Sequence, residues 1–418
     1  MTAAQVTALL LGLALIIVLA RVLGAVAKRL DQPPVIGEIL AGILLGPTLF
    51  DGAITNTLFP ADTRGYLASL ANLGVAVFMF VVGLELDRKL LRGNGKIATS
   101  VSVGSILLPF GLGAALALYL YANHPGPNKL SFVLFMGAAM SVTAFPVLAR
   151  IIADRGMQRT VLGGLALTCA AVDDVLAWSL LAGVIAVAGA GGAEQWRLFL
   201  LIPYLMVMLW VVRPLFTRML TKMKDKPLSA ESMTAVVAGL LASAAATEWI
   251  GLHYIFGAFL FGVVLPKEGY ENLRTEMVSK VNGFSGVVLL PVFFITVGFK
   301  VNLANLGSAG AVELLLVLAV AIVGKFVGAF TAARLNRVPS RTAAALATLM
   351  NTRGLTELII LSVGLQLKVI DERLYSIMVV MAVVTTVMAG PLLRVFYPRK
   401  QVELDRVEVA SRSAVAVS

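Results

Sequence analysis

The feature that most constrains this chain is a series of apolar segments, each about as long as a bilayer is thick. Cut at charged and Pro/Gly-rich positions, the 418 residues divide into thirteen such segments. A membrane-spanning helix needs about 20 mostly apolar residues, and helices satisfy their own backbone polar groups in lipid. We therefore predict an all-α polytopic membrane protein with about 13 transmembrane helices. The predicted spans are 6–27, 33–50, 66–86, 98–121, 130–152, 160–188, 196–219, 232–250, 253–266, 284–300, 312–333, 342–366 and 374–393.

Composition excludes several classes of protein. Only 14% of the residues are charged, against about 25% in ordinary soluble domains, so a soluble enzyme, a nucleic-acid binder and a disordered chain are all excluded. The single cysteine, Cys169, cannot form an intramolecular disulfide or a cysteine metal cluster. We expect no cofactor and no enzymatic reaction. The segment 253–266 is short, so twelve spans remain an alternative.

The positions of Lys and Arg predict the orientation of the chain. They are concentrated in every second connection between spans and after the last span, as Lys28, Arg334 and Arg399 illustrate. Positive residues are retained on the cytoplasmic side, and thirteen spans with an external N-terminus give the strongest asymmetry. We expect a retained first span, a cytoplasmic C-terminus and a place in the cell (inner) membrane.

The two halves of the chain resemble each other. Residues 78–86 match 293–301, and 36–47 match 256–266, in the same order and at nearly the same separation. Such internal repeats are typical of secondary transporters, whose binding sites lie near the midplane at interrupted helices. Six spans in the first copy and one linker span make an odd number, so the second copy lies inverted in the membrane. We predict a transmembrane domain over 1–397 (repeat one 1–190, linker helix 196–219, repeat two 230–397) and a short cytoplasmic tail over 398–418.

Charged residues inside the spans mark the candidate site. Each costs about 2.5–3.5 kcal/mol if it is unpaired at the centre of a lone helix, so it faces a cavity or a partner. Glu38 and Glu85 lie near span ends, where they can snorkel or cap a helix. The five that lie deeper are Asp173, Asp174, Lys325, Arg353 and Glu357.

The neighbours Asp173 and Asp174 must satisfy different partners. Successive residues of a helix point about 100° apart, so one carboxylate can form an ion pair while the other faces water. Their mutual repulsion favours retention of a proton by one of them. Lys325 is the only lysine deep inside a span, and Gly324 and Gly328 around it allow a neighbouring helix to approach closely.

Two spans carry signals of a break. The fifth contains the segment 141–146, where Pro146 removes a backbone donor that Ser and Thr side chains can compensate. Its repeat counterpart contains 351–357. There Arg353 suits the negative end of a first half-helix and Glu357 the positive start of a second, and their spacing also allows a direct ion pair. We expect these two charges to support the break.

These motifs together resemble the monovalent cation/proton antiporter family, which includes bacterial sodium/proton exchangers, potassium efflux proteins and plant cation/proton exchangers. The resemblance rests on 141–150, the Asp pair and 351–357, and it covers about 6–393. It implies a homodimer with a dimerisation domain and a core domain of six helices. Two crossing broken helices in the core would carry the ion site across the membrane by an elevator motion.

The resemblance also implies roles for individual residues. Asp174 would bind the monovalent metal cation or a proton, and Asp173 would pair with Lys325. Thr143 and carbonyl oxygens at the break would complete the coordination. Ser141 joins this cation- and proton-binding set, and the residues expected to support the broken helices are Arg353, Glu357, Pro146 and Asn351. Two adjacent acids imply electrogenic exchange.

Alternatives remain within the same fold. A channel would conduct without coupling to protons, and a sodium-coupled symporter would carry organic anions. The expected partners are Na⁺ or K⁺, H⁺, the lipid bilayer and a second copy of the chain, with no nucleic acid and with sodium slightly favoured over potassium. His124 and His253 fall in predicted external loops, where histidines are usually bystanders.

Overall fold

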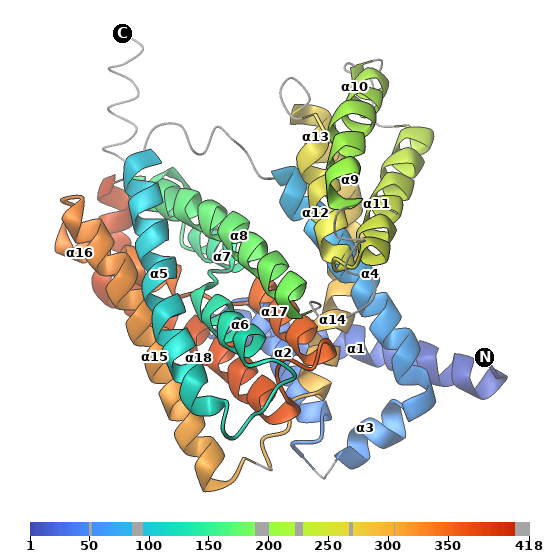
Figure 1. Cartoon of the computed structure of the whole chain (residues 1–418), viewed down its shortest axis with the longest axis horizontal. Coiled ribbons are helices and arrows are strands. Elements are labelled where there is room, and N and C mark those ends of the chain that lie inside the picture. Colours follow the sequence, from blue (N-terminus) through green and yellow to red (C-terminus); the bar gives the residue numbers. More distant parts are fainter. Residues whose placement is uncertain are drawn as a thin grey trace.

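The computed structural model is built of α-helices (Figure 1). It describes the ranges 1–49, 52–85, 95–188, 200–221, 229–266, 271–304 and 306–405. These ranges contain no strand. In chain order the helical elements are α1 (Ala3–Arg29), α2 (Pro34–Leu45), α3 (Ala53–Leu58), α4 (Ala61–Glu85), α5 (Gly95–Leu120), α6 (Lys129–Ser141), α7 (Phe145–Asp154), η3 (Met157–Arg159), α8 (Val161–Ala188), α9 (Leu201–Val207), η5 (Met208–Val212), α10 (Arg213–Thr221), α11 (Ala230–Ile250), α12 (Tyr254–Val264), α13 (Glu271–Phe284), η6 (Ser285–Leu289), α14 (Leu290–Phe299), α15 (Gly307–Leu335), α16 (Ser340–Met350), α17 (Leu355–Gln366) and α18 (Glu372–Phe396).

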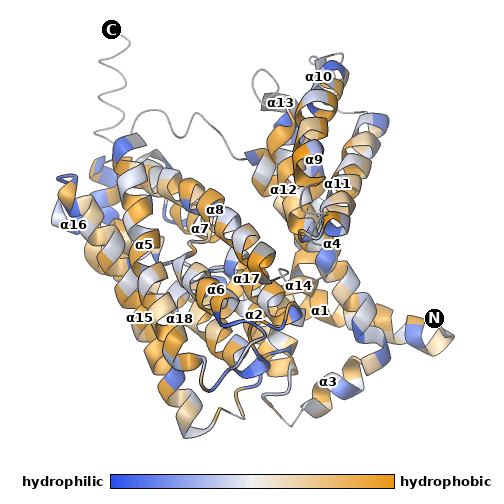
Figure 2. Cartoon of the chain, viewed as in Figure 1, coloured by the Kyte–Doolittle hydropathy of each residue, from blue (hydrophilic) through white to orange (hydrophobic). Residues whose placement is uncertain are grey.

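The helices confirm the predicted all-α polytopic class. In the described ranges, ten helical segments are long and apolar enough to cross a membrane, and three shorter apolar helices, α2, α12 and α17, accompany them. Together they coincide with the thirteen predicted spans. Figure 2 shows apolar residues along the lengths of the helices and polar residues near many of their ends, which is the pattern a bilayer requires.

The predicted limits fail where lipid does not constrain the chain. α2 ends at Leu45, earlier than predicted, because Gly46 and Pro47 follow it and neither residue favours a continuing helix. The short helix α3 lies in a segment predicted to be a loop. α13 begins at Glu271 and runs through polar residues before the predicted start of its span. Apolar length predicts the part of a helix that lies in lipid, not its polar extensions.

The helices form two groups (Figure 1). In one group, which we call the core bundle, α5–α8 pack with α15–α18, and α5 and α15 share the most extensive contact. In the other, which we call the panel, α1, α2 and α4 pack with α11, α12 and α14, and η5 of the linker helix contacts α12. A linker face carries large exposed apolar side chains such as Trp210, which is 72% exposed, and a chain in a bilayer can present such a face to lipid.

Equivalent positions of the two repeats make reciprocal contacts inside the panel. A Cβ atom on Gly37 would lie 2.1 Å from the carbonyl oxygen of Leu23, and one on Gly257 would lie 2.1 Å from that of Ser243. Both pairs sit where a neighbouring helix comes too close for any side chain. The contact between α1 and α2 is therefore repeated between α11 and α12, as a duplicated fold requires.

The repeats also pack against each other in a reciprocal way. A Cβ atom on Gly42 of α2 would lie 2.8 Å from the Cα of Gly298 on α14, and one on Gly262 of α12 would lie 3.0 Å from the carbonyl carbon of Gly83 on α4. The second helix of each copy thus packs against the third helix of the other. This exchange of partners supports the proposed inverted duplication.

Candidate functional site

Two interrupted helices meet in the core bundle, at the positions predicted from the sequence. Residues 142–144 separate α6 from α7, and residues 351–354 separate α16 from α17. The backbone N–H of Ala144 donates to the carbonyl oxygen of Thr352 at 3.1 Å, which joins the two breaks directly. Pro146 is the second residue of α7, where its missing N–H removes no helical hydrogen bond. The two breaks therefore form one polar centre.

A buried ion pair lies beside the first break. The Nζ of Lys325 on α15 is 3.1 Å from Oδ2 of Asp173 on α8. It also donates to Oγ1 of Thr143 at 2.6 Å, and this hydroxyl lies 2.8 Å from the same carboxylate oxygen. Ser105 of α5 donates to Asp173 Oδ2 at 3.1 Å. All four side chains are completely buried, so the pair is compensated by hydrogen bonds as a buried ion pair must be.

Asp174 faces a different environment. Its carboxylate accepts a hydrogen bond from the backbone N–H of Phe145, the first residue of α7, and so lies at the positive end of that half-helix. The side chain is 3% exposed, and its Oδ1 atom has no hydrogen-bond partner among the described residues. A buried carboxylate oxygen without a partner favours uptake of a proton or a cation.

A narrow cavity reaches Asp174 from one side. It is lined by Asp174 and Phe145 of the core bundle and by Glu85 and Phe259 of the panel. Its volume is about 10 Å³, roughly the space that one water molecule needs. The acid therefore lies at the boundary between the two groups of helices, and the panel contributes a second carboxylate, Glu85, to the same cavity.

Arg353 ties the second break to the first broken helix. It donates to Oε2 of Glu357 at 2.8 Å, and to the carbonyl oxygens of Ala139 and Met140 at 2.8 and 2.7 Å. The ion pair that the spacing allowed is formed. The sequence suggested that Arg353 would compensate the end of its own half-helix, whereas it caps the last turn of α6. A guanidinium at these free carbonyl oxygens is favourable.

The other predicted site residues lie near the break but make local contacts. The hydroxyl of Ser141 donates to the carbonyl oxygens of Gly137 and Ile106, at 2.6 and 3.2 Å, and not to either aspartate. Asn351 is buried, and its Oδ1 atom has no partner within the described ranges. Glu38 lies within α2 of the panel and belongs to neither break.

Sequence reasoning missed Ser105 as a partner of Asp173. Ser102 and Ser105 lie one turn apart in the apolar helix α5, and Ser102 donates to the carbonyl oxygen of Cys169 at 3.0 Å. Serines at this spacing in a membrane helix often bond to a neighbouring helix, which is the signal that could have identified them.

A second charged cluster, centred on the buried side chains of His124 and Glu313, was also missed, and it shows that His124 is not a solvent-facing loop residue. This side chain is 2% exposed. Its Nδ1 lies 2.7 Å from Asp371 Oδ2 and its Nε2 lies 3.2 Å from Glu313 Oε2; Glu313 also contacts Arg373 at 3.2 Å and accepts from Asn123 at 3.0 Å. Burial lowers the pKa of His124, but the hydrogen bonds and charges of Asp371 and Glu313 outweigh it and leave the pKa above its ordinary value.

Comparison with known proteins places these features in context. Residues 14–397 match the family model described as sodium/hydrogen exchanger, transmembrane. The Na⁺/H⁺ antiporter NhaS4 of Synechocystis is 43% identical over 401 residues, which cover 93% of this chain and 97% of that protein.

Eukaryotic relatives are longer. Cation/H⁺ antiporter 17 of Arabidopsis thaliana is 39% identical over 94% of this chain and 49% of its own length. K⁺/H⁺ antiporter 1 of Saccharomyces cerevisiae is 32% identical over 89% of this chain and 44% of its own length. The chain thus spans about half of each of these two proteins.

A solved structure has the same fold. The sodium proton antiporter MjNhaP1 of Methanocaldococcus jannaschii superposes with a TM-score of 0.61 over 97% of this chain and 99% of that one, at 15% sequence identity. At this identity the likeness concerns the fold alone.

Proposed function

The chain belongs to the sodium/hydrogen exchanger family, and from this premise we propose that it exchanges Na⁺ or K⁺ for protons across the membrane at Asp174. It is a multi-pass membrane protein. Relatives named for sodium and for potassium both match it. The adjacent acids favour sodium slightly, by analogy with other members of the family.

The unpartnered carboxylate oxygen of Asp174 carries the proposal. A buried negative charge is costly unless a proton, a cation or a hydrogen bond compensates it, and Oδ1 lacks such a partner among the described residues. The hydroxyl of Thr143 and the carbonyl oxygens of the break offer further oxygen ligands of the kind that alkali cations bind. The cavity beside the acid is so small that a hydrated cation and a proton would compete for it.

The buried pair of Asp173 and Lys325 supports coupling. A cation at Asp174 repels the ammonium of Lys325 and competes for the neighbouring carboxylate, so binding loosens the pair and favours release of a proton. If only compensated states cross the membrane, each ion gradient drives movement of the other ion. Release of more than one proton for each cation would make the exchange electrogenic.

The side of the molecule where α1, α7, α15 and α18 end carries many Lys and Arg residues. We assign it to the cytoplasmic side of the cell (inner) membrane. The core bundle is proposed to move as an elevator against the panel, and the panel to hold two copies together as a homodimer.

Substitution of Asp174 by asparagine tests the proposal. In sealed proteoliposomes with an imposed sodium or potassium gradient, Asp174→Asn should abolish proton movement, whereas Asp62→Asn, at an exposed acid at the start of α4, should leave it intact. Full exchange by Asp174→Asn would contradict the assignment. Cation flux without proton movement in the unmodified protein would identify a channel, and cation flux that requires an organic anion would identify a symporter.

A further inference from the structure

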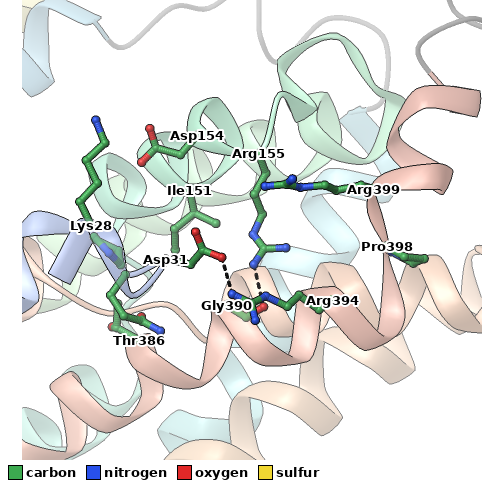
Figure 3. Close-up of a pocket in the computed structure, with 12 residues that line it drawn as sticks. Lys28, Asp31, Ile151, Asp154, Arg155, Thr386, Gly390, Arg394, Pro398 and Arg399 are labelled. Atoms are coloured by element: carbon green, nitrogen blue, oxygen red, sulfur yellow. Dashed lines mark hydrogen bonds and ion pairs between the residues drawn. The ribbon is translucent and has the colours of Figure 1, made fainter. Parts of the chain in front are cut away.

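A large cavity with several charged lining residues lies between the core bundle and the panel, and it contains neither aspartate of the candidate ion site (Figure 3). Its volume is about 560 Å³, within the range of pockets that hold small organic ligands. The end of α1 and its connection to α2 form one wall, and α7, α18 and the residues after α18 form the rest. None of the residues of the two breaks or of the aspartate pair lines it, although the lining residue Thr386 is hydrogen-bonded to the main chain of Arg353 in the second break.

The cavity has more positive than negative side chains. The charged lining residues are Lys28, Arg155, Arg394, Arg399, Asp31 and Asp154. Both acids are already engaged: Asp31 forms an ion pair with Arg394, and Asp154 pairs at 2.9 Å with Arg150, which does not line the cavity. Lys28, Arg155 and Arg399 are thus left without a carboxylate partner in the described ranges.

Arg155 is the most constrained of these cations. Its Nη2 group donates to the carbonyl oxygen of Gly390 on α18 at 2.7 Å, and the dashed line that leaves Arg155 in Figure 3 marks this bond. Burial lowers the pKa of Arg155, as do the positive charges of Arg394 and Arg399, against the opposing effect of Asp31. The fold therefore holds several guanidinium groups close together at a cost that an anion would relieve.

The wall also supplies a hydrogen-bond acceptor. The Nε2 group of Gln32 donates to the carbonyl oxygen of Val387 at 3.3 Å, while its Oε1 atom is buried and has no partner among the described residues. A ligand that fits this wall carries a hydroxyl or an acidic proton as well as negative charge.

We propose that this cavity binds a phosphate group, presented either by a soluble phosphorylated compound or by the headgroup of a lipid. Guanidinium groups match phosphate oxygens through paired hydrogen bonds. Arg155 and Arg399 would hold the phosphate, Lys28 would add charge from the panel, and Gln32 would accept from a protonated oxygen or a hydroxyl of the carrier. The volume leaves space for an organic group beside the phosphate.

Such a ligand would bridge the two groups of helices, since Lys28 belongs to the panel and the arginines belong to the core bundle. Occupancy would stabilise one relative position of the two groups and so change the exchange rate. This effect on exchange rests on the proposed function. Binding itself does not, so it is measured separately.

The test uses the purified full-length protein in two forms. The first, in detergent, is titrated with Tris phosphate against Tris chloride at equal ionic strength. The second is placed in phosphatidylcholine nanodiscs with or without phosphatidic acid. Thermal unfolding reports binding in both. The variant is Lys28→Gln/Arg399→Gln, at two exposed side chains, and the matched control is Arg218→Gln/Arg341→Gln, which removes two exposed charges outside the cavity.

We expect stabilisation by phosphate or by phosphatidic acid, and at least about tenfold weaker binding in the cavity variant, since each charge-assisted hydrogen bond contributes about a factor of ten. The control should bind as the unmodified protein does. Stabilisation in detergent identifies a soluble source, and stabilisation only in the nanodiscs identifies a lipid. The proposal is overturned if neither probe stabilises the protein, or if the cavity variant and the control respond equally. Loss of exchange in Asp174→Asn with phosphate binding retained would leave this inference standing.

Discussion

Replacement of Thr143 by valine tests whether one hydroxyl holds the buried charges of the site together. Oγ1 of Thr143 lies 2.6 Å from Lys325 Nζ and 2.8 Å from Asp173 Oδ2, and all three side chains are 0% exposed. Each hydrogen bond to a charged group contributes about 1.5–3 kcal/mol, so loss of two should lower the free energy of unfolding by about 3–6 kcal/mol. Valine has nearly the same volume and leaves no space for a compensating water.

The assay compares unfolding of the purified variants in sodium dodecyl sulfate and on heating. Thr385→Val is the matched control, because Thr385 is also buried but its hydroxyl donates only to main-chain oxygens of α18; its expected cost is about 1 kcal/mol. Thr143→Ser should recover most of the loss. Equal stability of Thr143→Val and Thr385→Val, together with an unchanged pH profile of exchange, would refute the reasoning.

Three further predictions concern other parts of the fold. The pKa of His124 is raised in the folded protein, so its positive charge contributes its full stabilisation below about pH 6.5, and this contribution is lost as the pH rises through the raised pKa. Thermal stability should therefore fall over that pH range in the unmodified protein and stay constant in His124→Gln. Parallel curves would exclude this cluster as the cause. Gly262→Ala places a Cβ atom 2.2 Å from a backbone oxygen of α4 and should cost about 1–3 kcal/mol, whereas Gly111→Ala meets nothing within 4 Å and should be neutral or slightly stabilising in the same unfolding assay. Arg353→Met leaves a buried carboxylate unpaired and should cost about 3–5 kcal/mol, seen as loss of monodisperse protein in size-exclusion chromatography; normal yield would show that the ion pair is dispensable.

The spans were predictable because a bilayer imposes one length and one polarity on every segment that crosses it. The same rule carries no information about α3 or about the polar helix α13, where only local helix propensity and packing decide. The two breaks were predictable from Pro146 and from charges in an apolar segment. Their direct contact was expected only from the family resemblance, since no local pattern places Ala144 beside Thr352.

The site was predictable in its residue types but not in its pairings. Asp173 and Lys325 are rare charges in apolar helices, so each of them predicts a partner of opposite charge. His124 does not, because a histidine in a loop usually faces water, and the paired serines of α5 indicate a contact with a neighbouring helix without showing that it is Asp173. The capping of α6 by Arg353 was likewise beyond reach, since nothing in the segment shows which helix end the guanidinium meets.

The partners of the buried ion pair come from α5, α8, α15 and the first break, all within the core bundle. If the core bundle moves against the panel as proposed, these hydrogen bonds would move with it and would not have to break. Affinity for the transported ion would then depend on Asp174 and the cavity beside it, whereas the rate of transport would depend on the rest of the contact between the core bundle and the panel. Substitutions in that contact, away from the cavity, should alter the rate and spare selectivity.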